Sequence, residues 1–149
     1  MSAGDYLHPA GVRFEHGRRD PDALLDDALD TGALIREVLD PLGPGGDGRY
    51  LPALRDAARD RSARAVRTAA PPGAVLLLDG GLLLGRWLPA DLTVHLAVRP
   101  GTLRRLTAPE DAWRLAAEDR YRAEADPEAA ADVVVRVDDP RRPGWVLER

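Results

Sequence analysis

The segment PPGAVLLLDGGLLLG, residues 71–85, decides how the rest of the sequence is interpreted. A continuous apolar run covers 75–78, ends at Asp79 and is followed by Gly80 and Gly81. This pattern predicts a strand over 74–79 that is buried on both faces and carries a carboxylate at its carboxyl end. In nucleotide-binding α/β proteins, such an acid usually faces a Mg²⁺ ion held by a phosphate-binding loop on a neighbouring strand. The interpretation of Asp79 therefore depends on whether the chain also contains such a phosphate-binding loop.

The basic residues exclude the commonest form of such a loop. All 21 of them are arginine, a bias typical of a high-GC genome, and the chain contains no lysine. A loop of the form G-x-x-x-x-G-K-[ST] uses its lysine to reach the β- and γ-phosphates, so this chain does not contain one. The glycine-rich segment 43–48 has a different spacing and follows an expected helix instead of a strand, so we interpret it as a plain loop.

Composition limits the classes of partner and compartment. The 149 residues have the usual length of one domain, and we expect a single domain over 1–149. The formal charge of −4 gives no support to a nucleic-acid partner. The chain has no apolar run of about 18 residues and no pattern of a signal peptide, so neither a membrane partner nor export is predicted. The absence of cysteine excludes disulfides and thiolate metal sites and fits a cytoplasmic protein.

Helical and strand patterns alternate along the chain. Asp20 and Pro21 are typical of a helix start, and the apolar stripe over 34–39 predicts a second helix that ends before Pro41. Residues 51–70 are ambiguous. The expected strands cover 74–79, 91–98, 131–139 and 145–148, and further helices start at about 102 and 108. The alternation predicts an α/β fold with three layers, in which helices flank a parallel sheet.

The candidate polar residues each have a plain structural alternative. Asp79 either faces a ligand or caps the following turn. His95 lies in the middle of an expected strand, where a satisfied core or face histidine is the default, and His8 and His16 lack acids at metal-ligand spacing.

Arginines of the two helices between strands 91–98 and 131–139 also have two interpretations. One is a set of surface ion pairs, each worth a few tenths of a kcal/mol. The other is that Arg104, Arg105 and Arg120 converge on a phosphate group, which arginine binds through two parallel hydrogen bonds.

A family resemblance emerges from nine short segments taken in order. They are SAGDYLHP (2–9), RFEHGRRDP (13–21), DALDTGAL (27–34), VLDPLGPGGDGRY (38–50), PPGAVLLLDG (71–80), DLTVHLAV (91–98), LRR (103–105), YRAEADPEAAADVVV (121–135) and DDP (138–140). In this order they resemble the uridine kinase-like nucleoside kinases of the P-loop kinase group. None of the segments is specific alone, and together they span nearly the whole chain.

The resemblance implies an enzyme that transfers the γ-phosphoryl group of ATP to the 5′-hydroxyl of a nucleoside, with Mg²⁺ as cofactor. It implies that Asp30 holds the ribose hydroxyls, and that Tyr6 and His8 also bind the substrate. Asp79 falls at the end of the strand beside the family's phosphate loop, where it would act in catalysis near Mg²⁺. Residues implied in the phosphate-binding lid are Arg104, Arg105 and Arg120.

Departures from the family pattern limit these implications. The family's first strand, its phosphate loop and the next helix have no counterpart in the chain. Gly4 stands at the position of the catalytic base, and Asp5 follows one residue later. A shift of one residue on an extended segment turns a side chain to the opposite face. No further arginine follows Arg105 in the shortened lid segment.

Three explanations of the missing loop stay open. The native protein is longer at its N-terminus, the chain is a degenerate kinase relative that acts as a non-catalytic binding module, or it is a complete enzyme with another phosphate site. In the second case, an unpaired sheet edge would join copies of the chain into a homo-oligomer. The sequence does not identify the nucleoside, and other acceptors such as pantothenate or phosphoribulose also stay open.

Overall fold

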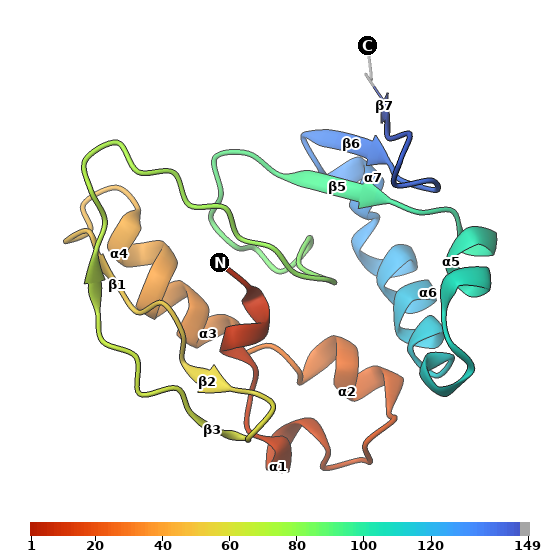
Figure 1. The fold of residues 1–149 in the computed structure, drawn as a ribbon, viewed down its shortest axis with the longest axis horizontal. Helices are drawn as coiled ribbons and strands as arrows, with labels where there is room; N and C mark the ends of the chain where they lie inside the picture. The colour runs from red at the N-terminus through yellow and green to blue at the C-terminus, as the bar shows by residue number, and fades with distance from the viewer. Residues whose placement is uncertain (147–149) are drawn as a thin grey trace. The chain divides into compact units, whose positions relative to one another are not determined.

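The computed structural model describes residues 1–146, and the chain forms two compact units, Met1–Leu83 and Leu84–Arg149 (Figure 1). Within 1–146, every helix is too short or too polar to cross a lipid bilayer. The single domain expected over 1–149 and the three-layer parallel sheet of P-loop kinase type stay predictions. The described strands form one mixed sheet of three strands and two antiparallel pairs.

The helices of unit 1 are short and lie in its first half. Asp20 accepts a hydrogen bond from the Ala23 N–H (2.9 Å) and Pro21 is the first helical residue, so the predicted helix start is confirmed. The helices of this unit are η1 (Ala3–Tyr6), α1 (Ala10–Arg13), α2 (Pro21–Asp26), α3 (Thr31–Leu34), the π-helical segment η2 (Ile35–Leu39) and α4 (Asp40–Leu42). The last three follow one another without a break (Figure 1).

Pro41 does not end this helical run, so that part of the prediction is wrong. Proline has no N–H to donate to the carbonyl of Glu37, four residues earlier. The Asp40 N–H instead bonds to the Ile35 carbonyl, which is π-helical geometry. The Glu37 carbonyl that Pro41 leaves free accepts the N–H of Leu51 (3.0 Å) and so ties the helix to the segment that follows it.

The core of unit 1 lies between η1, α2 and the helical run over 31–42. Tyr6, Leu34 and Val38 are completely buried, and Ala3 packs at the start of the same core. Two short antiparallel pairs follow: β1 (Arg49–Tyr50) with β4 (Thr68–Ala69), in which β1 packs against η2 and α4, and β2 (Arg55–Asp56) with β3 (Arg61–Ser62), in which β2 packs against η1.

The segment 74–79 is not a buried strand, so this prediction is wrong. Its one bridge pairs Asp79 with Ser2 in parallel, through hydrogen bonds from the Ala3 N–H to the Asp79 carbonyl (2.8 Å) and from the Asp79 N–H to the Met1 carbonyl (3.0 Å). Val75 is 84 % exposed and Leu77 is 78 % exposed. A strand buried on both faces needs long neighbours on both sides, and the described residues pair it at a single position.

Unit 2 combines a sheet with helices. Its helices are α5 (Pro100–Leu106), the 3₁₀ turn η3 (Pro109–Asp111), α6 (Arg114–Ala125) and α7 (Pro127–Ala130), and its strands are β5 (Val94–Ala97), β6 (Val133–Arg136) and β7 (Gly144–Val146). The strands predicted within 91–98 and 131–139 are confirmed with shorter bounds, and β5 runs parallel to β6. β7 is antiparallel to β6; the last two residues of the strand expected over 145–148 lie outside the described residues.

Hydrogen bonds of two side chains, Asp132 and Tyr121, link separate segments of unit 2. The Asp132 carboxylate accepts from both the N–H and the hydroxyl of Thr93, each at 2.7 Å, and so joins the starts of the two parallel strands. The buried Tyr121 hydroxyl accepts the N–H of Leu84 (3.0 Å). His95 is half-buried on β5, where burial lowers its pKa, which fits the face histidine expected at this position.

Two leucine truncations test the burial pattern of unit 1. Leu34→Ala removes a completely buried side chain and should lower the free energy of unfolding by about 2–5 kcal/mol. Leu77→Ala, the matched control, removes an exposed side chain and should cost less than about 0.5 kcal/mol. Urea unfolding followed by circular dichroism measures both. Equal costs would contradict the exposed placement of Leu77.

Candidate functional site

His8 and Asp30, two residues predicted to bind substrate, lie side by side in unit 1. Leu7 and Leu29 form an antiparallel bridge. The His8 N–H donates to the Ala28 carbonyl (2.9 Å), and the Asp30 N–H donates to the Tyr6 carbonyl (2.8 Å). As a result, the His8 Nδ1 lies 3.7 Å from the Asp30 Oδ2, with both side chains about one third exposed. Solvent and a ligand can therefore reach this pair.

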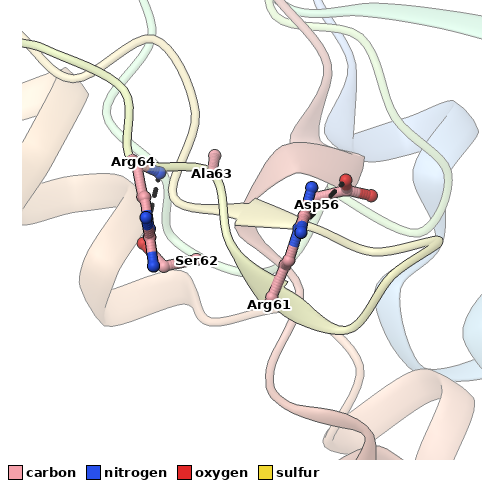
Figure 2. Close-up of a pocket in the computed structure, with 5 residues that line it drawn as sticks. All are labelled: Asp56, Arg61, Ser62, Ala63 and Arg64. Carbon is pink, nitrogen blue, oxygen red and sulfur yellow. Dashed lines mark hydrogen bonds and ion pairs between the residues drawn. The ribbon is translucent and has the colours of Figure 1, made fainter.

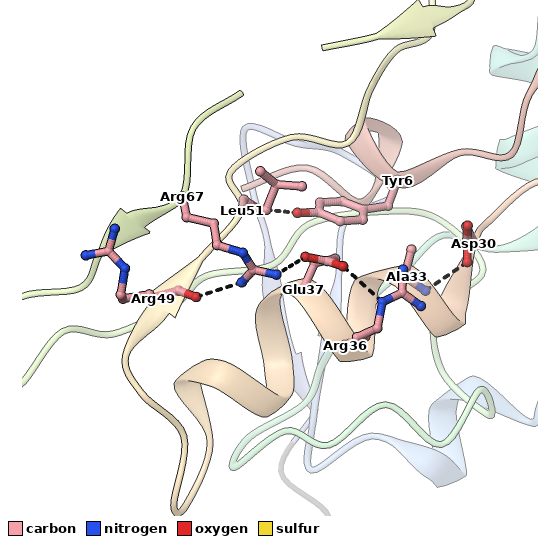
Figure 3. Close-up of polar contacts among 8 residues, drawn as sticks. All are labelled: Tyr6, Asp30, Ala33, Arg36, Glu37, Arg49, Leu51 and Arg67. Carbon is pink, nitrogen blue, oxygen red and sulfur yellow. Dashed lines mark hydrogen bonds and ion pairs between the residues drawn. The ribbon is translucent and has the colours of Figure 1, made fainter. Parts of the chain in front are cut away.

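The two oxygens of the Asp30 carboxylate have different surroundings. Oδ1 accepts the N–H of Ala33 (2.8 Å) and caps helix α3, as Figure 3 shows. Aspartate is a preferred capping residue, so the cap alone explains why Asp30 stands here. The cap also fixes the orientation of the carboxylate and leaves Oδ2 facing His8. An oriented, partly exposed carboxylate oxygen is a good acceptor for the hydroxyl of a ligand.

Tyr6 is a core residue whose backbone carbonyl is hydrogen-bonded to Asp30. Its hydroxyl donates to the carbonyl of Leu51 (Figure 3). Burial raises the pKa of Tyr6 from 10.0 to about 12, and the nearby charges of Glu37 and Asp5 add to the increase. The phenol therefore stays neutral and is enclosed by protein. Tyr6 contributes to the site through its backbone carbonyl, which holds Asp30.

Glu37 is the centre of a charged network next to Tyr6. Its carboxylate pairs with Arg67 and, at 2.9 Å, with the Nε of Arg36. Arg67 also donates to the carbonyl of Arg49 (3.0 Å), so the network joins η2 to the β1–β4 pair (Figure 3). Each arginine makes a close ion pair with a different oxygen of Glu37, and such contacts between elements are typical of a structural role.

Asp5 and Asp79, the residues predicted for catalysis, stand near the same backbone segment. The Asp5 N–H donates to the Ser2 carbonyl (3.1 Å), and Ser2 forms the bridge to Asp79. The Asp79 side chain is 78 % exposed and lies 3.9 Å from the amino group of Met1. Among residues 1–146, no three histidine or carboxylate side chains are grouped to hold a metal ion. Mg²⁺ is usually held by one or two carboxylates together with substrate phosphates, so the role of Asp79 stays a prediction.

The arginines predicted for the phosphate-binding lid lie on α5 and α6. Arg104 pairs with Asp119 (2.9 Å), and Arg120 pairs with Glu124 one turn further along α6 (2.8 Å). Arg105 is exposed on α5. The first two contacts match the surface ion-pair interpretation, and pairs of this kind contribute little to stability. The convergence of all three arginines on phosphate stays a prediction.

Arginines also gather around Asp60, and no sequence pattern predicts this cluster. The Asp60 Oδ1 accepts the N–H of Ala10 (2.8 Å) and lies 3.8 Å from the Arg13 Nη2 and 3.8 Å from the Arg55 Nη1. Arg13 also donates from Nε to the His8 carbonyl (2.8 Å) and so connects this cluster to the backbone of the His8–Asp30 pair. The sequence signal for it is the high arginine content of residues 55–64, a segment whose secondary structure the sequence does not predict.

A shallow pocket of about 190 Å³ lies on the neighbouring β2–β3 pair (Figure 2). Asp56 pairs with Arg59 at 2.9 Å and lies 3.9 Å from Arg61. The hydrogen bonds from Arg59 lower the pKa of Asp56. The residues that line the pocket are Asp56, Arg61, Ser62, Ala63 and Arg64. Its polar, exposed lining is that of a surface hollow between charged side chains.

Comparisons with family models, curated proteins and solved structures found no match to this chain.

The raised pKa of Tyr6 predicts how stability depends on pH. Between pH 10 and about 12 the unfolded phenol ionises while the folded one stays protonated, so the unfolded state binds fewer protons. The free energy of unfolding should therefore fall as pH rises through this interval. In Tyr6→Phe the fall should be shallower, with the raised pKa of Tyr121 still contributing. Urea unfolding at several alkaline pH values measures the slope, and equal slopes for the two proteins would contradict the assignment.

Proposed function

We propose that unit 1 is the nucleoside-binding part of an ATP- and Mg²⁺-dependent phosphotransferase of the uridine kinase type. The observation that carries this proposal is the His8–Asp30 pair, held by the bridge between Leu7 and Leu29. The motif order of the sequence supports the same assignment, because Asp30 falls where the family holds the ribose hydroxyls.

The chemistry of Asp30 suits a sugar diol. Two neighbouring ribose hydroxyls offer two O–H donors, and a carboxylate accepts such hydrogen bonds more strongly than a neutral group does. The cap on Ala33 orients the carboxylate before a ligand arrives, which lowers the entropy cost of binding. His8 lies against the oxygen that the cap leaves open and can make a further polar contact to the sugar.

The residues present do not make a site for the phosphates of ATP. The chain has no lysine, Asp79 is a single exposed carboxylate, and Arg104 is paired with Asp119. We derive no transfer step through these residues. In the proposal, this chain of 149 residues binds a nucleoside without phosphorylating it, and transfer needs a binding element for ATP in addition to the residues named here.

A non-catalytic interaction module is the second candidate, and the open edge of β5 favours it. Val94 is 50 % exposed and Leu96 is 62 % exposed on this strand. The carbonyls of Thr93 and Ala97 accept N–H groups of the β6 segment, so the alternate residues direct their backbone groups to the free edge. An exposed apolar edge is a template for pairing with a second copy of the chain.

Two aspartate substitutions test nucleoside binding. Asp30→Asn keeps a side-chain oxygen for the cap and removes the charge, so uridine should bind about tenfold to a hundredfold more weakly, which corresponds to about 1.5–3 kcal/mol for a charged hydrogen bond. Asp20→Asn is the matched control, because Asp20 caps α2 in the same way. Isothermal titration calorimetry with uridine and 2′-deoxyuridine measures the affinities. Unchanged affinity in Asp30→Asn, or no uridine binding by the unmodified chain, would overturn the proposal.

The second candidate predicts self-association that depends on Leu96. If copies pair through β5, the unmodified chain should form dimers, and Leu96→Arg should be monomeric, because a charge on the paired edge opposes sheet extension. Leu106→Arg on α5 is the control, since Leu106 is similarly exposed at 64 %. Light scattering after size-exclusion chromatography gives the masses. A monomeric unmodified chain would exclude this candidate.

A further inference from the structure

The arginine cluster around Asp60 carries more positive charge than its neighbours compensate. Arg13 and Arg55 approach the same carboxylate oxygen, so the two guanidinium groups share one negative charge. Both distances are 3.8 Å, which is longer than an N–H···O hydrogen bond of about 2.7–3.2 Å. The oxygen they share is already bonded to the N–H of Ala10. The cluster therefore has a net positive charge and unused hydrogen-bond donors.

Both arginine side chains are held in place and mostly buried. The Arg13 side chain is 13 % exposed, donates to the His8 carbonyl and lies over the ring of Phe14 at 4.7 Å. The Arg55 side chain is 20 % exposed, and its strand is fixed by pairing with Ser62. The Asp60 side chain, at 40 % exposed, leaves an approach from solvent.

The Nε of Arg55 is evidence that the cluster binds a further hydrogen-bond acceptor. It is buried and has no hydrogen-bond partner among residues 1–146. Leaving a buried donor unpaired destabilises a protein, and native proteins rarely retain such a donor without a ligand or an ordered water. Asp60 supplies one negative charge for the two guanidinium groups, so their mutual repulsion is only partly compensated.

We propose that Arg13 and Arg55 bind a phosphate group. A guanidinium group donates two parallel hydrogen bonds to an oxyanion, and two such groups need more acceptor oxygens than one carboxylate offers. Phosphate has enough oxygens to form short hydrogen bonds to both arginines at once, whereas Asp60 offers them one oxygen that already accepts the N–H of Ala10. The ligand is free phosphate or a small phosphate ester, and in either case the arginines move from their long contacts with Asp60 to short ones with the ligand.

This site is independent of the proposed nucleoside site. It uses neither Asp30 nor the His8 ring, although Arg13 contacts the His8 backbone. Phosphate binding and uridine binding can therefore be measured separately, and each can fail without the other.

Asp60→Asn is the decisive variant, because the proposal predicts a gain. Asparagine keeps an oxygen for the Ala10 N–H and removes the charge that competes with phosphate, so phosphate should bind several-fold more tightly. Partial unfolding cannot produce a gain in affinity. Asp56→Asn is the matched control, because Asp56 lies on the same hairpin and pairs with Arg59 and Arg61 instead; its phosphate affinity should change less than twofold.

Arg55→Gln tests the loss of affinity. It should weaken binding of inorganic phosphate at least tenfold, whereas Arg61→Gln, an exposed arginine of the same hairpin, should change it less than twofold. Calorimetric titration with inorganic phosphate at constant ionic strength measures both, and circular dichroism shows that each variant is folded. Titration with methyl phosphate is the arm for a phosphate ester, because it carries no nucleoside for the His8–Asp30 pair, and tighter binding of it than of inorganic phosphate would assign the ester as ligand.

Three results would overturn the proposal. They are no binding of either phosphate form by the unmodified chain, no gain in Asp60→Asn, and an equal loss in Arg55→Gln and Arg61→Gln. Asp30→Asn should leave binding of inorganic phosphate unchanged. If that variant loses uridine binding and keeps phosphate binding, both proposals stand. If phosphate binds and uridine does not, only the proposed function fails.

Discussion

The backbone bridge between Leu7 and Leu29 is the interaction on which unit 1 depends. Its two hydrogen bonds join a segment near the N-terminus to the start of the helical run over 31–42. The same contact places Tyr6 in the core and sets His8 against Asp30. One short pairing thus links the most buried aromatic side chain of unit 1 to its most promising binding residues.

Arginine serves several physical roles in a chain that has no lysine. On α5 and α6, exposed guanidinium groups pair with exposed carboxylates, where solvent screens the attraction and the net contribution is small. Around Glu37 the arginines join η2 to a strand pair. Arg13 and Arg55 differ from both groups, because they are mostly buried and share one carboxylate at a long distance. Burial makes incomplete pairing costly, so this is where an external anion would have the largest effect.

Exposed apolar surface is the second feature that needs an explanation. Residues 75–78 and the outer edge of β5 both carry apolar side chains that solvent reaches. The apolar run over 75–78 is the strongest strand signal in the sequence, and the described residues pair it at one position only. Local composition expresses a tendency to form a strand, whereas burial requires neighbouring strands on both sides. The exposed edge of β5 supports the interaction-module candidate.

The sequence by itself determined the features that depend on near neighbours. Asp20 and Pro21 start α2, the strands within 91–98 and 131–139 form β5 and β6, and the helices between these strands allow the parallel pairing. Only the tertiary structure decided the features that depend on distant residues. It brought His8 to Asp30, left Val75 and Leu77 exposed, continued a helix through Pro41 and joined Arg13 to Arg55 through Asp60. Caps and periodic patterns follow from interactions a few residues apart, but burial and ion pairing depend on which distant segments meet, and no short stretch of sequence contains that information.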